Sequence, residues 1–290
     1  MHRPKTTHCL IETLAEITSL AKSLNVNQLQ TPTDCPGWNV QDNLSHIISI
    51  ESWLLGNEFT THKADDISNT KNELGVLNEN EVDLRRSHNK SQLIEELESV
   101  TEPRIQYLKN LTQEDLSSPA WTPIGQQTLE DQCLIRLLDC WAHMQDINNA
   151  LDLDFDDVSA SSALVLNYSI STLPKTFAKS IQEDNGLFKL SVLTHSQLDF
   201  SENISNKFEN GYAFMIAKEN GRGAFVHEPY EPSSSNNVVD ETVNEALISH
   251  KTLISLLLGR KNYNEVKSDV KVSGNQNIVD QVLTNLNFMI

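Results

Sequence analysis

The chain has few positive charges for its length, and this scarcity excludes whole classes of partner. Its 290 residues include 22 Lys and Arg against 40 Asp and Glu, which gives a formal net charge of -18 at pH 7. A surface this acidic repels the phosphates of DNA, RNA and anionic lipids. We therefore expect neither a nucleic acid nor a membrane as its partner.

Long apolar runs and paired cysteines are also missing. No uncharged apolar stretch approaches the roughly 18 residues of a membrane-spanning helix, and Glu12 and Glu16 interrupt the opening segment where a signal peptide would be apolar. No cysteine has the CxxC spacing of a zinc knuckle or the pairing of a disulfide framework. The sequence therefore predicts a cytoplasmic protein with reduced thiols, which are Cys9, Cys35, Cys133 and Cys140.

Charge divides the chain into two halves. Residues 1–160 hold 11 Lys and Arg against 26 Asp and Glu, whereas residues 161–290 hold 11 against 14. The stretch from Leu151 to Ser162 carries four aspartates followed by small polar residues without helical periodicity, which is typical of a solvated connection. We therefore predict two domains, covering residues 1–160 and 161–290.

The first half has the pattern of a helical bundle. Apolar residues from Leu10 to Leu24 recur at alternating spacings of four and three. A turn-rich segment then precedes Asn39, which can cap the next helix. The predicted helices cover residues 10–24, 39–55, 91–111 and 128–150, and Pro103 is expected to kink or split the third. Helices of this length and number predict a four-helix bundle.

The second half changes to a mixture of helix and strand patterns. After one predicted helix at 163–182, short runs rich in β-branched or aromatic residues are bounded by Gly, Asn, Asp or Pro, as strands commonly are. These predicted strands cover residues 187–193, 212–217 and 223–227. A helix at 245–258, an alternating strand at 266–272 and a closing helix at 278–286 follow. The chain is therefore expected to have an α+β fold, with helices packed on a small sheet.

Residues that can bind a metal gather in the last helix of the first half. At about 100° per residue, Asp139, His143 and Asp146 fall within roughly 60° of one another and point toward the bundle interior. A buried carboxylate needs a partner, because leaving it unpaired costs several kcal/mol. A divalent metal is one such partner, with His46 of the second helix as a candidate third ligand. A hydrogen bond or a surface ion pair between Asp139 and His143 fits the spacing as well.

Two segments resemble the DinB-like, mycothiol-dependent maleylpyruvate isomerase family. The first is TPTDCPGWNVQDNLSHI, a Pro-Gly-Trp turn leading into a helix that carries a histidine. The second is LIRLLDCWAHMQDINNAL, which contains a Trp-x-His-x-x-Asp-Ile run. Residues 252–260 and 270–274 are similar to the family's C-terminal sterol-carrier-like domain. The resemblance covers nearly the whole chain and implies a metal-binding four-helix bundle followed by a small α+β domain.

The resemblance also implies a site. A divalent metal, usually zinc, would be held by His46, Asp139 and His143, and Asp146 would lie behind these ligands or face the substrate. In the family the metal coordinates a low-molecular-weight thiol, mycothiol, whose thiolate attacks the substrate. Asp139 stands where the founding enzyme has the longer Glu, and the composition differs from that of mycothiol producers, so a different thiol is also considered. Arg260, which follows an apolar segment, is a candidate to bind a substrate carboxylate.

The function expected from these residues is metal-dependent, thiol-using isomerisation or thiol transfer on a small molecule, by a monomer or a homodimer. The sequence leaves two alternatives open. In the first, the C-terminal domain binds a small apolar ligand and the bundle is not catalytic. In the second, a metal-activated water replaces the thiol, and the protein is a hydrolase.

Overall fold

A computed structural model describes residues 6–181, 186–199, 205–226 and 243–287. The chain divides into two compact units, the first ending at Asp156 and the second beginning at Asp157. This division falls inside the aspartate-rich stretch between residues 151 and 162. Among the described helices, none is long and apolar enough to cross a membrane.

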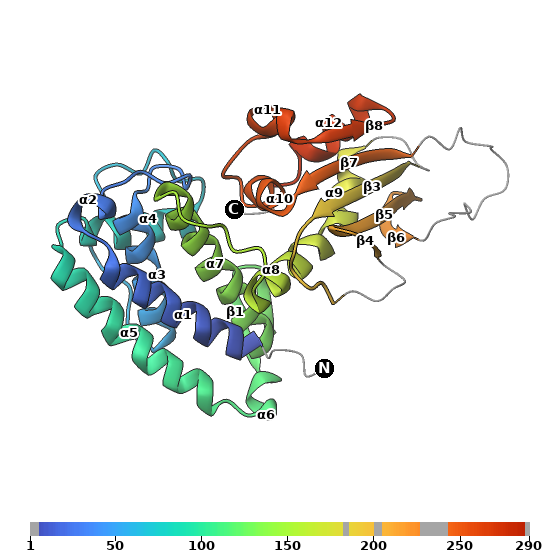
Figure 1. Ribbon diagram of the computed structural model, residues 1–290. Coiled ribbons are helices and arrows are strands. Elements are labelled where there is room, and N and C mark those ends of the chain that lie inside the picture. The colour runs from blue at the N-terminus through green and yellow to red at the C-terminus, as the bar shows by residue number, and fades with distance from the viewer. Residues whose placement is uncertain (1–5, 182–185, 200–204, 227–242, 288–290) are drawn as a thin grey trace. The chain divides into compact units, whose positions relative to one another are not determined.

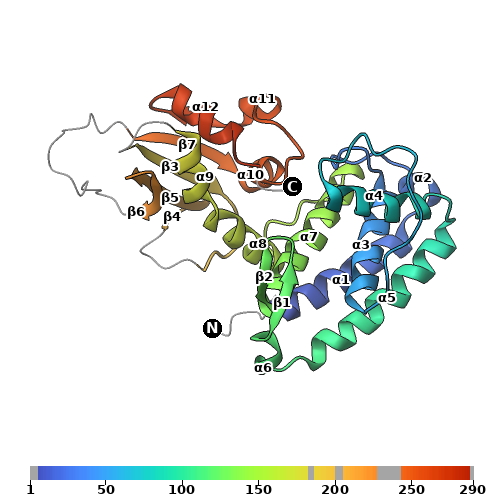
Figure 2. The ribbon, with the colours of Figure 1, turned by 180° about the vertical axis from the view of Figure 1, so that it is seen from behind.

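The first unit is built from helices and one small hairpin (Figure 1). Its elements are α1 (Thr6–Ser23), α2 (Val26–Leu29), α3 (Val40–Leu54), α4 (Glu73–Arg85), α5 (Lys90–Asn110), α6 (Gln113–Leu116), β1 (Pro119–Thr122), β2 (Gly125–Thr128) and α7 (Leu129–Ala150). Helices α1 and α3 each contact both α5 and α7, so these four helices close into a bundle. The hairpin packs on α7 (Figure 2). The helical first half predicted from the sequence is confirmed.

Side-chain caps fix where the two central helices begin. Asn39 accepts a hydrogen bond from the backbone N–H of Asp42, whose carboxylate accepts one from the backbone N–H of Asn39. Thr128 and Asp131 form the same reciprocal pair at the start of α7. Such a capping box satisfies N–H groups that the helix itself leaves unpaired. Because each helix starts at a defined residue, the direction in which its later side chains point is also fixed.

The first unit differs from the sequence prediction at two helices. Of the kink or split expected at Pro103, the split does not occur, because helix α5 continues through this residue. Proline removes the hydrogen bond to the carbonyl four residues earlier, and here that residue, Ser99, is exposed, so water can take the place of the missing donor. Helix α4 was not predicted, because its sequence ELGVLNENEVDLR has few apolar residues and no clear stripe.

The second unit is an α+β unit with a mixed sheet. Its elements are α8 (Ala160–Ser171), α9 (Leu173–Ser180), β3 (Leu187–Leu193), β4 (Asn206–Phe208), β5 (Gly211–Glu219), β6 (Arg222–Val226), β7 (Asn244–Ser249), α10 (His250–Leu257), α11 (Tyr263–Val266), the 3-10 helix η1 (Lys267–Asp269), β8 (Lys271–Ser273) and α12 (Gln276–Thr284). The strand order is β4-β5-β3-β7-β8, and β6 also pairs with β5. Strands β3 and β7 are parallel, whereas the other pairs are antiparallel. Helix α9 contacts β5 and β6, and α12 contacts β7. The predicted α+β fold class is confirmed.

Three predicted elements of this unit need correction. The expected helix at 245–258 begins as strand β7 and becomes helical only at His250. Residues along β7 alternate between buried and half-buried, and pairing with β3 and β8 satisfies its backbone. The expected strand at 266–272 shortens to β8 and is preceded by α11 and η1. The helix expected at 163–182 divides at Thr172, just before Pro174. The predicted ends at Gln182 and His227 lie outside the described residues.

Candidate metal centre

The structure brings together the three residues that the sequence singles out as ligands. His46 on α3 faces His143 on α7, with ring centroids 4.9 Å apart. Asp139 Oδ2 lies 3.1 Å from His46 Nε2, and Asp139 Oδ1 lies 3.7 Å from His143 Nε2. One donor atom from each residue lies within 4.8 Å of the other two. The two imidazoles are buried and the Asp139 side chain is 18% exposed, so solvent reaches the group at the carboxylate.

This group has the donor chemistry and spacing of a divalent metal site. Two imidazole nitrogens and one carboxylate oxygen are a common ligand set for zinc and several other divalent ions. Ligand atoms around a tetrahedral zinc lie roughly 3.4 Å apart, and the two contacts of Asp139 bracket this separation. Nδ1 of His46 is buried without a hydrogen-bond partner. The residues present therefore fit a metal ion.

Two neighbours hold His143 in the orientation that a metal ligand needs. Nδ1 of His143 lies 2.6 Å from Oδ1 of Asn43 and 3.2 Å from a carboxylate oxygen of Asp146. Both oxygens accept hydrogen bonds, so we assign the ring proton to Nδ1, which leaves the lone pair of Nε2 facing Asp139. Metal-binding histidines are commonly fixed by such an outer contact. Asp146 thus lies against His143 and is buried, and the catalytic role expected for it stays a prediction.

A second group of donors shares the same histidine. Cys35, His143 and Asp146 are all buried and also lie within 4.8 Å of one another. Spacing in the sequence gave no sign of this, since Cys35 belongs to the turn before α3. Because Oδ1 of Asn43 lies 2.6 Å from Nδ1 of His143, a metal bound to that nitrogen would have to displace Asn43. We therefore regard the set with His46 and Asp139 as the stronger candidate.

Electrostatics place Asp139 and His46 in the protonation states that bind a metal. Burial acts to raise the pKa of Asp139, but His46 and Arg136 beside it hold that pKa well below its usual range. Burial lowers the pKa of His46, against the opposing effect of Asp139. At neutral pH the carboxylate is therefore charged and the imidazole is neutral. Metal ligands must be deprotonated in this way before they can coordinate.

A chain of buried ion pairs lies directly behind Asp139. Arg136 contacts Oδ2 of Asp139 at 2.5 Å and Oε1 of Glu51 at 2.8 Å. The other oxygen of Glu51 accepts a hydrogen bond from Arg104 at 2.7 Å. Glu51 is fully buried, and both arginines are nearly so. No sequence pattern indicated Glu51 or Arg104. Arg136 could have been found, because it stands three positions before Asp139 and so shares its helix face.

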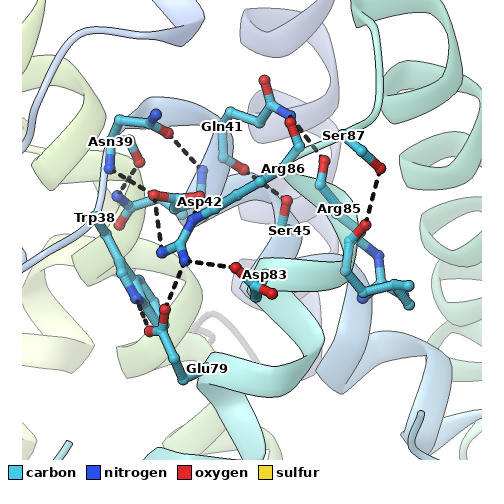
Figure 3. A network of polar contacts seen from close by, with 12 residues as sticks. Trp38, Asn39, Gln41, Asp42, Ser45, Glu79, Asp83, Arg85, Arg86 and Ser87 are labelled. Carbon is cyan, nitrogen blue, oxygen red and sulfur yellow. Dashed lines mark hydrogen bonds and ion pairs between the residues drawn. The ribbon is translucent and has the colours of Figure 1, made fainter. Parts of the chain in front are cut away.

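Trp38 covers the two histidine rings, and a polar network anchors it. Its ring centroid lies 5.2 Å from that of His46 and 5.6 Å from that of His143. The indole Nε1 donates a hydrogen bond to Glu79 on α4 at 2.9 Å, and Arg86 joins Glu79 to other carboxylates nearby (Figure 3). Those carboxylates are Asp42 and Asp83, each 3.1 Å from Arg86. The unpredicted helix α4 therefore holds the indole against the candidate metal centre.

Arg260 was also expected to contribute to the site. It belongs to the second unit, where its Nη1 donates a hydrogen bond to the carbonyl of Leu258 at 3.2 Å. This contact places the guanidinium at the end of α10, as the sequence suggested. Its contact with a substrate carboxylate stays a prediction.

The chain matches known proteins over both of its units. Residues 11–148 match the family model described as mycothiol maleylpyruvate isomerase N-terminal domain. No curated protein matches the chain by sequence. A crystal structure of the mycothiol-dependent maleylpyruvate isomerase is similar with 12% identity, a TM-score of 0.50 and coverage of 94% of this chain and 93% of that chain. An alanine mutant of that isomerase covers the same shares, with 11% identity and a TM-score of 0.48.

A third similar structure is sterol carrier protein 2 from Yarrowia lipolytica in its apo form. It matches 47% of this chain and 98% of its own, with 16% identity and a TM-score of 0.27. That score is too low to show what the second unit binds.

Together these findings define a class of protein: a helical bundle with a buried histidine–carboxylate group, joined to an α+β unit. The helical unit belongs to the mycothiol maleylpyruvate isomerase N-terminal domain family. The likeness to the solved isomerase extends the shared fold to nearly the whole chain.

Proposed function

We propose that this protein is a metal-dependent enzyme that uses a low-molecular-weight thiol for isomerisation or thiol transfer on a small substrate. The observation that carries the proposal is the convergence of His46, Asp139 and His143 from two helices of the bundle. Three protein ligands leave a position open for a small molecule, which is the arrangement of catalytic rather than structural zinc sites. Zinc is the metal we propose, and mycothiol or another small thiol is the proposed cosubstrate.

The chain's own residues define what each part of the site would do. A bound divalent ion would stabilise the thiolate form of the thiol, which is the nucleophile. Asn43 and Asp146 keep the proton on Nδ1 of His143, so Nε2 stays available. Trp38 packs against both imidazoles at a tilt, and its bulk would limit the access of water to them.

Two of the chain's cysteines are poor nucleophiles, which favours an external thiol. Burial raises the pKa of Cys133 to about 11, and it raises the pKa of Cys140 further still. Both thiols therefore stay protonated at neutral pH, and a protonated thiol is a weak nucleophile. A freely supplied reduced thiol also fits the proposed cytoplasmic setting.

Metal analysis tests the ligand set directly. The protein, purified without a histidine tag, should hold about one ion per chain, and His143→Ala should hold almost none. The control is His8→Ala, because His8 lies in the same unit but is exposed and pairs with Glu12 on α1. Equal metal content in wild type and His143→Ala would end the proposal.

Turnover with and without added thiol tests the chemistry. Candidate substrates are small carboxylates with a cis double bond, assayed with mycothiol, with glutathione and with no thiol. We expect turnover only in the presence of a thiol. Thiol-independent hydrolysis by the metal-loaded protein would instead make it a metal-assisted hydrolase.

Variants of the two remaining candidates separate metal binding from catalysis. We propose that Asp146 acts through His143 and that Arg260 binds a carboxylate of the substrate. Asp146→Asn should retain the metal and lower kcat, whereas Arg260→Gln should raise KM with little change in metal content. Wild-type kinetics in both variants would remove them from the proposed site.

A further inference from the structure

Arg136 is shared between two buried carboxylates at the edge of the candidate metal centre. Its Nη1 lies 2.5 Å from Oδ2 of Asp139, and its Nε and Nη2 lie 3.0 and 2.8 Å from Oε1 of Glu51. Glu51 is fully buried and keeps its second oxygen on Arg104. The guanidinium of Arg136 is therefore held by Glu51 on one side and contacts Asp139, the proposed metal ligand, on the other.

The charges of this chain of residues balance before any metal binds. Arg104, Glu51, Arg136 and Asp139 alternate in sign along consecutive contacts, so their formal charges cancel. Asp139 therefore already has a cationic partner in the protein. A divalent ion would bring a second positive centre to the same carboxylate, at a place where low dielectric strengthens the repulsion between cations.

The contacts of Asp139 also distinguish its two oxygens. Oδ2 faces Arg136 and Nε2 of His46, whereas Oδ1 faces Nε2 of His143 at the longer distance of 3.7 Å. Arg136 thus occupies the Oδ2 side of the carboxylate. A metal that binds Asp139 has to share the carboxylate with this guanidinium.

We propose that Arg136 is a positioning residue that competes with the metal for Asp139 and so weakens metal binding. This inference rests on the proposed function. Glu51 moderates the competition, because it draws the guanidinium away from Asp139 and offsets its charge. The pair gives the site a stable form without metal and makes loading reversible.

Zinc titrations of tag-free protein against a chromophoric chelator test this competition. Arg136→Gln removes the competing charge and should bind zinc about tenfold more tightly, because the repulsion between the guanidinium and the cation is removed. Arg136→Lys keeps the charge and should stay close to wild type. Glu51→Gln removes the carboxylate that shares Arg136 with Asp139, so Arg136 should pair more strongly with Asp139 and zinc should bind more weakly. Circular dichroism of each variant checks its fold.

Competition predicts tighter zinc binding in Arg136→Gln and weaker zinc binding in Glu51→Gln. Structural damage would instead weaken zinc binding in both variants. Unchanged or weaker binding in Arg136→Gln overturns the inference, since the carboxylate would then need Arg136 in order to bind. If Arg136→Gln does not fold, Arg136→Ala takes its place with the same two outcomes, and zinc binding by Glu51→Gln that is as tight as wild type or tighter also overturns the inference. Wild-type protein that binds no zinc at all would instead contradict the proposed function.

Discussion

The two units of this chain bury different kinds of side chain. The helical unit encloses a set of charged and ionisable residues, which are Asp42, His46, Glu51, Glu79, Glu81, Arg85, Arg104, Arg136, His143 and Asp146. In the described part of the second unit, most buried polar residues are serines and threonines, and no carboxylate is buried. Its core is apolar, with Phe188 and Phe214 among the largest fully buried side chains.

This difference shows where the chemistry of the molecule is concentrated. A buried charge costs free energy unless a partner of opposite sign or a hydrogen bond compensates it. The helical unit therefore depends on the pairing of its charges, whereas the second unit depends on apolar packing. Clusters of perturbed ionisable groups are also common at functional sites, and the helical unit has such a cluster around His46, Arg136 and Asp139.

The largest expected effect concerns the apolar core of the second unit. Phe214→Ala in β5 should lower the free energy of unfolding by about 3–5 kcal/mol, because it leaves a cavity in a packed core. Hydrogen exchange measured by mass spectrometry should show lost protection in the second unit, with the metal content unchanged. Loss of metal in this variant would contradict the separation of roles between the units.

The second prediction concerns the buried ion pairs of the helical unit. Glu51→Gln should lower the free energy of unfolding of the helical unit by about 3 kcal/mol, because two buried arginines lose their shared counter-charge. Urea denaturation measures the change. Glu95→Gln on the exposed face of α5 is the control and should shift stability by less than about 0.5 kcal/mol. Equal effects in the two variants would show that the buried pairs carry no special stability.

A smaller effect is expected where the polar network meets the indole. Trp38→Phe keeps a ring over the histidines but removes the hydrogen bond from Nε1 to Glu79. The expected loss is about 1.5 kcal/mol, since the acceptor is a charged group that is buried. Trp121→Phe, at a residue that is 53% exposed, provides the control and should be nearly neutral. A loss in Trp121→Phe as large as that in Trp38→Phe would remove the role assigned to the network.

The smallest expected effect concerns pH and the metal-free protein. Burial lowers the pKa of His46 below its ordinary value of 6.5 in the folded state. The unfolded chain then binds the proton more readily, so the stability from neutral His46 is present above pH 6.5 and is lost as pH falls toward the folded pKa. The slope is at most about 1.4 kcal/mol per pH unit. Urea denaturation in chelator between pH 5 and 7 should show a shallower slope for His46→Gln, and an unchanged slope would contradict the assignment.

Sequence periodicity was enough to find the elements that carry the candidate site. The apolar stripe beginning at Leu10 gave α1, the cap expected at Asn39 gave the start of α3, and the helix predicted at 128–150 corresponds to α7. Helical phase then placed Asp139 and His143 on one face, since a helix repeats its direction every three to four residues. His46 was already a candidate partner of that face, and the family resemblance strengthened this choice, because spacing alone also left an ordinary ion pair open.

Residues that act through neighbours distant in sequence could not be found in the same way. Glu51 lies on α3 and Arg104 on α5, and their pairing depends on the contact between these two helices, which are distant in sequence. Asn43 and Cys35 reach His143 only after the turn before α3 has folded. Strand β7 was read as helix because a short apolar run fits both structures until its partner strand is known.

The place of Trp38 also gives the protein an optical reporter. All four tryptophans of the chain, Trp38, Trp53, Trp121 and Trp141, precede residue 157 and so belong to the helical unit. Intrinsic tryptophan fluorescence therefore reports on the helical unit and should not report directly on the unfolding of the second unit. Because the indole of Trp38 lies close to both imidazoles, protonation or occupancy of the site should change its emission. Events at the candidate centre can thus be followed without a label.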